Sequence, residues 1–150
     1  MVIAVLSSVV LFTMSQYINI GKDSNLAGTL SSLIPAGEIF YSGNSNSYNN
    51  EDSGISFCNP NQNSVLRNVI SQMPQAITTD CYDSNMNPAS WGPILNPAGL
   101  CCHASASAWV AFARLFVNNN EIYCVDSRGV RKNTDASEIY NITTAFRCFP

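Results

Sequence analysis

The chain has 150 residues, the size of a single domain, and 46% of them are hydrophobic, which is enough to bury a sizeable core. Only 11% of the residues are charged, and the net charge is −3. The chain has seven Lys and Arg against ten Asp and Glu, too few basic residues to form a basic patch that binds nucleic acid. Six cysteines in a chain so poor in charge indicate an oxidising compartment rather than the cytosol.

The first fourteen residues carry no charge and read MVIAVLSSVVLFTM. As a helix they would span about 21 Å, short of the roughly 30 Å hydrocarbon core of a bilayer. No Lys or Arg precedes the apolar run, so the segment differs from a cleavable signal peptide. A third option is that the chain as given begins inside a longer apolar helix, where about five to eight more residues would complete a membrane-spanning segment, given the bilayer thickness.

Beyond Met14 the sequence becomes amphipathic, because apolar residues recur at steps of three and four and so share one helical face. One helix is predicted from the N-terminus to about Tyr41, near 60 Å long. Pro35 removes a backbone donor and crowds the carbonyl of Ser31, so a kink or break is expected before it. Residues 15–20 are expected to unwind most easily. The apolar face consists of Leu26, Leu30, Leu33, Ile34, Gly37, Phe40 and Tyr41.

The remainder of the chain alternates between turn-rich segments and short apolar elements. Gly, Asn, Ser and Pro mark the loops, and runs of β-branched or aromatic residues mark the strands. Asp126-Ser127-Arg128-Gly129 has the chemistry of a turn between two strands. The predicted elements are a loop at 42–50, a helix at 63–73, an irregular segment at 80–99 and strands at 108–117, 122–125 and 130–132.

Six cysteines allow fifteen pairings, and the sequence alone does not choose among them. A rival interpretation is a metal site, but adjacent ligands give poor tetrahedral spacing. Cys102 and His103 are also poor candidates for a catalytic nucleophile and base, since the side chains of neighbouring residues in a strand point apart and no third group is suggested that would orient them. We expect His103 to lie in a loop. The residues considered for the metal site are Cys81, Cys101, Cys102 and His103.

Two further patterns concern ligands and modification. Asp83, Asn85 and Asn87 alternate like the start of a calcium loop, but the glycine and the glutamate that such a loop needs are replaced. Residues 141–143 match a glycosylation sequon, a short pattern that often occurs by chance. Neither pattern predicts a cofactor or a metal, and we expect no catalytic residue.

Several segments of the chain form a recognisable combination. They are the uncharged start VIAVLSSVVL, the helix end Ala36-Gly37-Glu38-Ile39-Phe40-Tyr41, the loop 44–48, Ala108-Trp109-Val110, the block from Tyr123 to Gly129, and the closing Cys148 and Pro150. Taken together these segments resemble a type IV pilin, and in detail the short pilins of candidate-phylum bacteria. The family's motif after its processing site, Phe-Thr-Leu-Ile-Glu or similar, is not present. Because the match is continuous from Val2 onward, we expect the chain as given to begin inside the mature protein; the alternative is a protein that never had the motif and is not processed like a pilin.

The resemblance implies an α+β fold, in which a long N-terminal helix packs on a small antiparallel β-sheet stapled by disulfides. The helix would comprise residues 1–41, apolar over residues 1–20 and amphipathic over residues 21–41, and the disulfide-rich head would comprise residues 42–150. The family pattern suggests the pairs Cys124–Cys148 and Cys58–Cys102, which leaves Cys81–Cys101 to close an inserted loop. Each bond would contribute on the order of 2–4 kcal/mol.

The resemblance also implies a function, that of a structural subunit of an extracellular type IV pilus used for attachment or motility. Its partners would be copies of itself in a helical homopolymer, the inner membrane before assembly, the pilus assembly machinery, and a host or neighbouring cell surface. The alternatives are a minor pilin, a type II secretion pseudopilin, or a membrane-anchored extracellular binding protein. The residues expected to form the filament core are Val2, Ile3, Val5, Leu6, Val9, Val10, Leu11 and Phe12.

Overall fold

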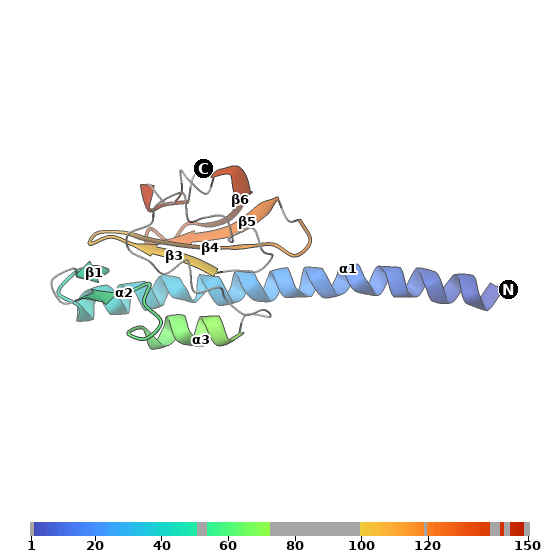
Figure 1. Ribbon diagram of the computed structural model, residues 1–150, viewed down its shortest axis with the longest axis horizontal. Helices are drawn as coiled ribbons and strands as arrows, with labels where there is room; N and C mark the ends of the chain where they lie inside the picture. The colour runs from blue at the N-terminus through green and yellow to red at the C-terminus, as the bar shows by residue number, and fades with distance from the viewer. Residues whose placement is uncertain are drawn as a thin grey trace.

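Two consecutive helices form the long axis of the molecule in the computed structural model (Figure 1). Helix α1 (Val2–Ser31) and helix α2 (Leu33–Gly43) run nearly in line, and the N-terminal half of α1 extends beyond the head. The structure describes residues 2–50, 54–72, 100–118, 120–138, 142 and 145–148, with side chains from residue 14 onward. The predicted α+β class is confirmed.

The break between the two helices falls at Ser32, before Pro35, as the sequence predicts. Pro35 has no N–H to donate to the carbonyl of Ser31, so the regular hydrogen-bond ladder is interrupted there. The Ser32 N–H and hydroxyl instead donate to the carbonyl of Thr29, at 3.2 and 2.6 Å, and close α1 with a tight turn. Helix α2 then continues to Gly43, two residues beyond the expected end.

The head contains a four-stranded antiparallel sheet in which neighbours in sequence are neighbours in space. Its strands are β3 (Leu100–Ala104), β4 (Trp109–Arg114), β5 (Glu121–Asp126) and β6 (Arg131–Asp135). The strands expected at 108–117 and 122–125 are confirmed as β4 and β5. The third expected strand begins one residue later and runs three residues further than predicted. Strand β3 was not predicted at all.

The smaller elements are the two-residue strands β1 (Asn49–Asn50) and β2 (Ile55–Ser56), helix α3 (Ser64–Gln72), and the short 3₁₀ turn η4 (Ala136–Glu138). Strand β1 and the end of α2 both lie in the predicted loop 42–50, which is therefore more regular than its composition suggests. The short helix expected at 63–73 is confirmed as α3. Asn63 caps it, since its Oδ1 accepts hydrogen bonds from the N–H groups of Val65 and Leu66, both at 3.1 Å.

Both faces of the sheet are covered, and each has its own apolar core. Helices α1 and α2 lie between α3 and one face of the sheet (Figure 1), and the fully buried Leu30, Leu33 and Trp109 fill that core. On the opposite face, Ile142 and Cys148 of the C-terminal segment pack against the strands. Burial on both faces explains why β4 is apolar at every position from Trp109 to Ala113.

The end of α2 is fixed to the head by aromatic contacts. The Phe57 ring lies 4.7 Å from that of Trp109 and 5.5 Å from that of Phe40, measured between centroids. The Tyr48 hydroxyl donates to Glu38 Oε1 at 3.1 Å. Burial, together with this hydrogen bond to a carboxylate, raises the pKa of Tyr48 to about 12. These contacts hold the helix in one orientation on the sheet.

Replacement by Ala should change the free energy of unfolding in opposite directions at Gly37 and at Gly28. A Cβ at Gly37 would lie 2.5 Å from Nε1 of the fully buried Trp109, whereas a Cβ at Gly28 would meet nothing within 4 Å. Overpacking costs about 1–3 kcal/mol, and replacing helical Gly by Ala gains up to about 1 kcal/mol. We therefore expect Gly37→Ala to lower the free energy of unfolding by about 1–2 kcal/mol and Gly28→Ala to raise it. Denaturant titration of the unassembled protein measures both, and shifts of the same sign would contradict this account.

Candidate functional site: the projecting helix and its junction with the head

The N-terminal half of α1 projects away from the head and carries the chain's N-terminus at its far end (Figure 1). The residues predicted for the filament core all lie on this half of α1, with helical backbone. Their side chains lie outside the described portion of the structure. These residues are Val2, Ile3, Val5, Leu6, Val9, Val10, Leu11 and Phe12.

The described side chains nearest the projecting half form an exposed apolar surface. Met14, Tyr17, Ile18 and Ile20 are between 51% and 73% exposed. Residues 15–20, which were expected to unwind most easily, are helical in this structure. Soluble monomers rarely expose contiguous apolar surface of this kind, so the surface indicates an interaction. Over the residues that the structure describes, no helix has both the length and the apolar character needed to cross a membrane.

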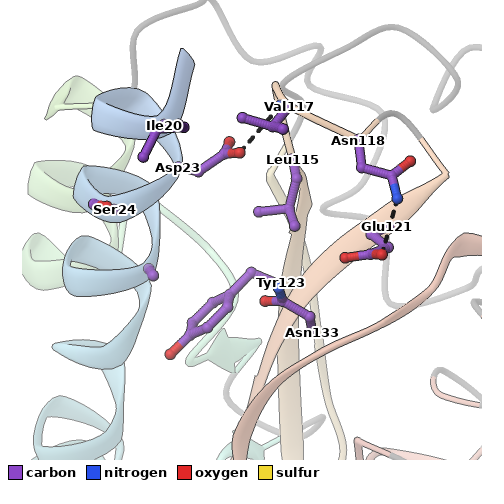
Figure 2. Close-up of a pocket in the computed structure, with 10 residues that line it drawn as sticks. Ile20, Asp23, Ser24, Leu115, Val117, Asn118, Glu121, Tyr123 and Asn133 are labelled. Carbon is purple, nitrogen blue, oxygen red and sulfur yellow. Dashed lines mark hydrogen bonds between the residues drawn. The ribbon is translucent and has the colours of Figure 1, made fainter. Parts of the chain in front are cut away.

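A carboxylate fixes the helix to the head where the exposed surface ends (Figure 2). Asp23 of α1 accepts hydrogen bonds from the backbone N–H groups of Phe116, at 2.6 Å, and Val117, at 3.1 Å, in the β4–β5 turn. The ammonium of Lys22 lies 5.1 Å from the centroid of the Phe116 ring. Two neighbouring residues of α1 therefore hold one turn of the head, and they set where the helix leaves it.

An open groove of about 370 Å³ lies beside this junction, between α1 and the end of the β4–β5 hairpin (Figure 2). Ile20, Ala27, Leu115 and Val117 contribute aliphatic side chains to its lining. On its rim Asn118 Nδ2 donates to Glu121 Oε1 at 2.8 Å. Because Ile20 belongs both to the groove and to the exposed surface of α1, the groove extends the candidate interaction surface onto the head.

Removing the Asp23 carboxylate is expected to loosen this junction. In Asp23→Ala the N–H groups of Phe116 and Val117 lose their acceptor, and the free energy of unfolding should fall by about 1–2 kcal/mol because Asp23 is partly solvated. Hydrogen exchange should be faster at these two amides than in the unchanged protein. Ser24→Ala, on the same rim, is the matched control. Unchanged protection of both amides in Asp23→Ala would show that the Asp23 carboxylate does not hold this turn.

Two disulfides between described residues join the head internally. Cys58 and Cys102 are 44 residues apart in sequence, with Cα atoms 5.4 Å apart, and Cys124 and Cys148 are 24 residues apart, with Cα atoms 5.9 Å apart. These are two of the pairs that the resemblance implied. Cys101 is also disulfide-bonded, and Cys81, its expected partner, lies outside the described residues. The disulfides indicate an oxidising location, extracellular or periplasmic.

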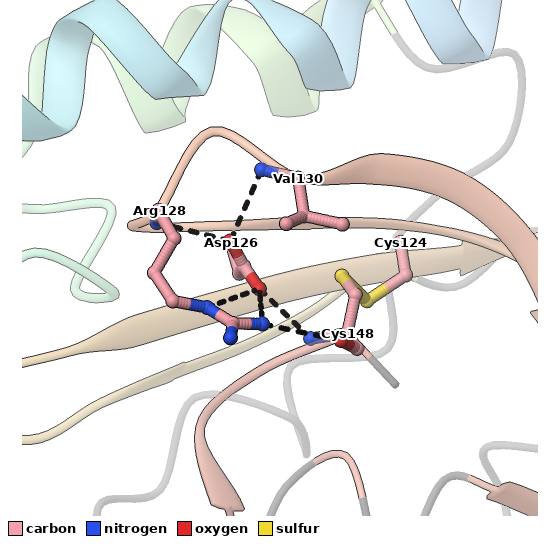
Figure 3. The surroundings of a disulfide bond; sticks show 5 residues. All are labelled: Cys124, Asp126, Arg128, Val130 and Cys148. Carbon is pink, nitrogen blue, oxygen red and sulfur yellow. Dashed lines mark hydrogen bonds and ion pairs between the residues drawn. A yellow bond between two sulfur atoms is a disulfide. The ribbon is translucent and has the colours of Figure 1, made fainter. Parts of the chain in front are cut away.

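A buried carboxylate organises the surroundings of the second disulfide (Figure 3). Asp126, at the end of β5, is fully buried and forms an ion pair with Arg128 at 2.8 Å. Its Oδ1 accepts from the N–H groups of Arg128 and Val130, and its Oδ2 accepts from the N–H of Cys148 at 3.0 Å. Full pairing of this kind is what a carboxylate needs in order to remain buried.

His103 lies in strand β3, not in the loop that was expected. It is 8% exposed, and its ring packs edge-on against Phe146 with the centroids 5.8 Å apart. Burial lowers the pKa of His103 to about 4, so the imidazole is neutral at physiological pH. Among the residues that the structure describes, no three or more His, Cys, Asp and Glu gather in a way that could hold a metal ion.

Several of the weaker patterns fall outside the described residues. Asp83, Asn85 and Asn87, the incomplete calcium loop, and Cys81 of the proposed metal set are among them. Asn141 of the glycosylation sequon is another. These interpretations stay predictions from sequence.

Sequence reasoning missed both carboxylates that organise the head. Asp126 opens the turn that was recognised at 126–129, and an Asp in that position commonly accepts hydrogen bonds from its own turn. Its bond to the N–H of Cys148, 22 residues away, has no local signal. Asp23 is likewise 93 residues from the Phe116 amide that it binds. Contacts at such separations depend on the fold and not on a motif.

The comparisons with known proteins do not name a family. No family model matches the chain, and neither the curated proteins nor the solved structures give a significant match. The architecture itself is pilin-like: a long N-terminal helix packs on a four-stranded antiparallel sheet, and disulfides join the head.

Proposed function

We propose that the protein is a structural subunit of an extracellular type IV pilus, in which the apolar N-terminal helices form the filament core and the heads form the outside. The projecting half of α1 carries this proposal. The first thirteen residues of the chain have no charged side chain, and the apolar side chains that follow, Met14, Tyr17 and Ile18, are exposed on the free helix. Such a surface needs a partner in every state of the protein.

Assembly would supply that partner. Before assembly the apolar helix would be held in the inner membrane, and the pilus machinery would then transfer it into a bundle of identical helices. Burying about 1,000 Å² of apolar surface contributes on the order of 25 kcal/mol before entropy is subtracted. Copies that add head to tail without closing form an open helical polymer. The proposal includes no catalysis, cofactor or nucleic-acid binding, and it leaves the exposed loops of the head to contact a host or neighbouring cell.

An acidic residue in the helix core tests the proposal directly. Val9→Asp and Leu11→Asp each place a carboxylate where the proposal needs apolar helix contacts, and burying an unpaired charge is strongly unfavourable. We expect no filaments in cells that express either variant. Gln72→Glu adds the same charge on the exposed face of α3 and is the matched control. Normal filaments from the two core variants would contradict the proposal.

Filaments sheared from the cell surface, pelleted and viewed by electron microscopy provide the measurement. Mass spectrometry of the pellet should show this chain as the main band. A minor pilin or pseudopilin would instead be a trace component of fibres built from another subunit. A membrane-anchored binding protein would stay with the cells and be released only by detergent.

A further inference from the structure

Two side chains of the β5–β6 turn hold the backbone of a single distant residue, Cys148 (Figure 3). Asp126 Oδ2 accepts its N–H at 3.0 Å, and Arg128 Nη2 donates to its carbonyl oxygen at 3.2 Å. The Cα atom of the residue held in this way lies 5.9 Å from that of Cys124. We propose that Asp126 and Arg128 dock Cys148 in the reduced chain and thereby direct its oxidation to Cys124.

The length of chain between the cysteines does not explain why Cys124 pairs with Cys148. Cys148 lies 24 residues after Cys124, and Cys102 and Cys101 lie 22 and 23 residues before it. Loop-closure probability varies slowly with length, so random encounters would favour these three partners of Cys124 within about 20% of one another. Some structural feature must therefore select the native pair.

Once the sheet has formed, Cys101 and Cys102 can no longer pair with Cys124, but Cys101 still competes with Cys124 for Cys148. Cys102 faces the helix side of the sheet, in the core that also contains Cys58. Cys101 is opposite Phe112, and Phe112 is opposite Cys124, so these three share the other face and the two cysteines are separated by a whole strand. That separation, roughly 10 Å, is too large for a disulfide. Cys148 packs in the same cluster as both Cys101 and Cys124, so its selection between them is the step that needs direction.

The docking site is built from residues close together in sequence. Besides Cys148, the carboxylate of Asp126 binds the N–H groups of Arg128 and Val130 and the guanidinium of Arg128, two and four residues away. The Gly129 N–H donates to the Asp126 carbonyl at 3.0 Å and closes the same turn. These bonds require only the β5–β6 hairpin, so an acceptor and a donor are in place before the C-terminal segment arrives.

The covalent step is ordinary thiol–disulfide exchange with a small disulfide such as oxidised glutathione. The Cys124 thiolate attacks that disulfide and releases one glutathione thiolate. The docked Cys148 thiolate then attacks the Cys124 sulfur of the mixed disulfide, forming the Cys124–Cys148 bond and releasing the second glutathione. Two protein thiols lose two protons and two electrons, and one oxidised glutathione becomes two reduced molecules. Asp126 and Arg128 take no part in electron transfer and act as positioning residues.

Oxidative refolding of the full chain tests the proposal. The reduced, denatured protein is diluted into a glutathione redox buffer, the reaction is stopped by alkylation at intervals, and peptide mapping counts each pair. In Asp126→Ala we expect the Cys124–Cys148 bond to form about tenfold more slowly and a mispaired Cys101–Cys148 product to accumulate. The rate of Cys58–Cys102 formation should stay unchanged. Asp135→Asn removes an exposed carboxylate from the neighbouring strand β6 and should refold like the unchanged protein.

Asp126→Asn keeps the proposal testable if Asp126→Ala does not fold, because it leaves no unpaired buried charge. Its remaining side-chain oxygen can still accept the N–H groups of Arg128 and Val130, but its amide nitrogen cannot accept the Cys148 N–H. Arg128 still donates to the Cys148 carbonyl, so the rate should fall about threefold with pairing still largely native. Native pairing at an unchanged rate in both variants would overturn the proposal. An equal slowing of Cys58–Cys102 would also overturn it, because Asp126 would then only stabilise the head as a whole.

Discussion

In a parent protein whose Cys81 and Cys101 are already Ala, replacing Cys58 and Cys102 together by Ala should lower the free energy of unfolding by about 4 kcal/mol. In this parent the bond closes the full 44-residue loop, because the bond expected between Cys81 and Cys101 no longer shortens it. In the chain-entropy description its main effect is to restrict the unfolded chain. Domains of this size are stable by only about 5–15 kcal/mol, so the loss is a large share of the total. Denaturant titration of the oxidised variant against that parent measures the loss, and the same parent serves for the second bond.

The second disulfide provides the matched comparison. Cys124→Ala with Cys148→Ala removes a bond that closes 24 residues, for which the same relation gives about 3.5 kcal/mol. The order of the two losses therefore follows loop length. The reverse order, or a loss below about 1 kcal/mol for the longer loop, would mean that local packing governs the contribution of these bonds and loop entropy does not.

Strand β3 explains why the two adjacent cysteines need different partners. Successive side chains in a strand point to opposite faces. Cys102 thus enters the core beneath the helices, where Cys58 is buried, and Cys101 enters the core beneath the C-terminal segment. The resemblance supplied a pairing of this kind, but the physical reason for it lies in a strand that the sequence did not predict.

The elements that could be predicted are those with a strong local pattern. Helix α3 has an Asn at its N-cap and an apolar face at helical spacing, and β4 is apolar on both of its faces. The break before Pro35 follows from one missing N–H. Each of these signals lies within a few residues of its element, and tertiary contacts reinforce it.

The elements that were missed depend on long-range pairing. Strand β3 is Leu-Cys-Cys-His-Ala, which has no alternation and no β-branched residue, and pairing with β4 determines its conformation. Strand β6 reads Arg-Lys-Asn-Thr-Asp and lies at the edge of the sheet, so no apolar periodicity marks its length. The candidate site divides in the same way. The apolar start of α1 is evident in the sequence, whereas the hydrogen bonds of Asp23 to Phe116 and Val117 form only once the helix has packed beside the β4–β5 turn.

Protonation of His103 should make the head less stable in acid. The folded-state pKa of about 4 lies below the ordinary value of 6.5, because burial disfavours the charged imidazole. A His with a depressed pKa contributes its full stability above about pH 6.5, where both states are neutral. As the pH falls through 6.5 the unfolded chain takes up a proton that the folded protein does not, and stability falls until about pH 4. The shift corresponds to about 3 kcal/mol.

Comparison with His103→Gln isolates this residue from the carboxylates, which titrate over some of the same range. The free energy of unfolding is measured at about pH 7 and about pH 4 for both proteins. The decrease between the two pH values should be smaller in the variant by about 3 kcal/mol. His103 and Cys101 lie on the same face of β3, the face that the C-terminal segment covers, and His103 packs against Phe146 of that segment. Amides of the C-terminal segment should therefore lose hydrogen-exchange protection first. Equal decreases in the two proteins would show that the imidazole is solvated enough in the folded head to take up its proton at an ordinary pH.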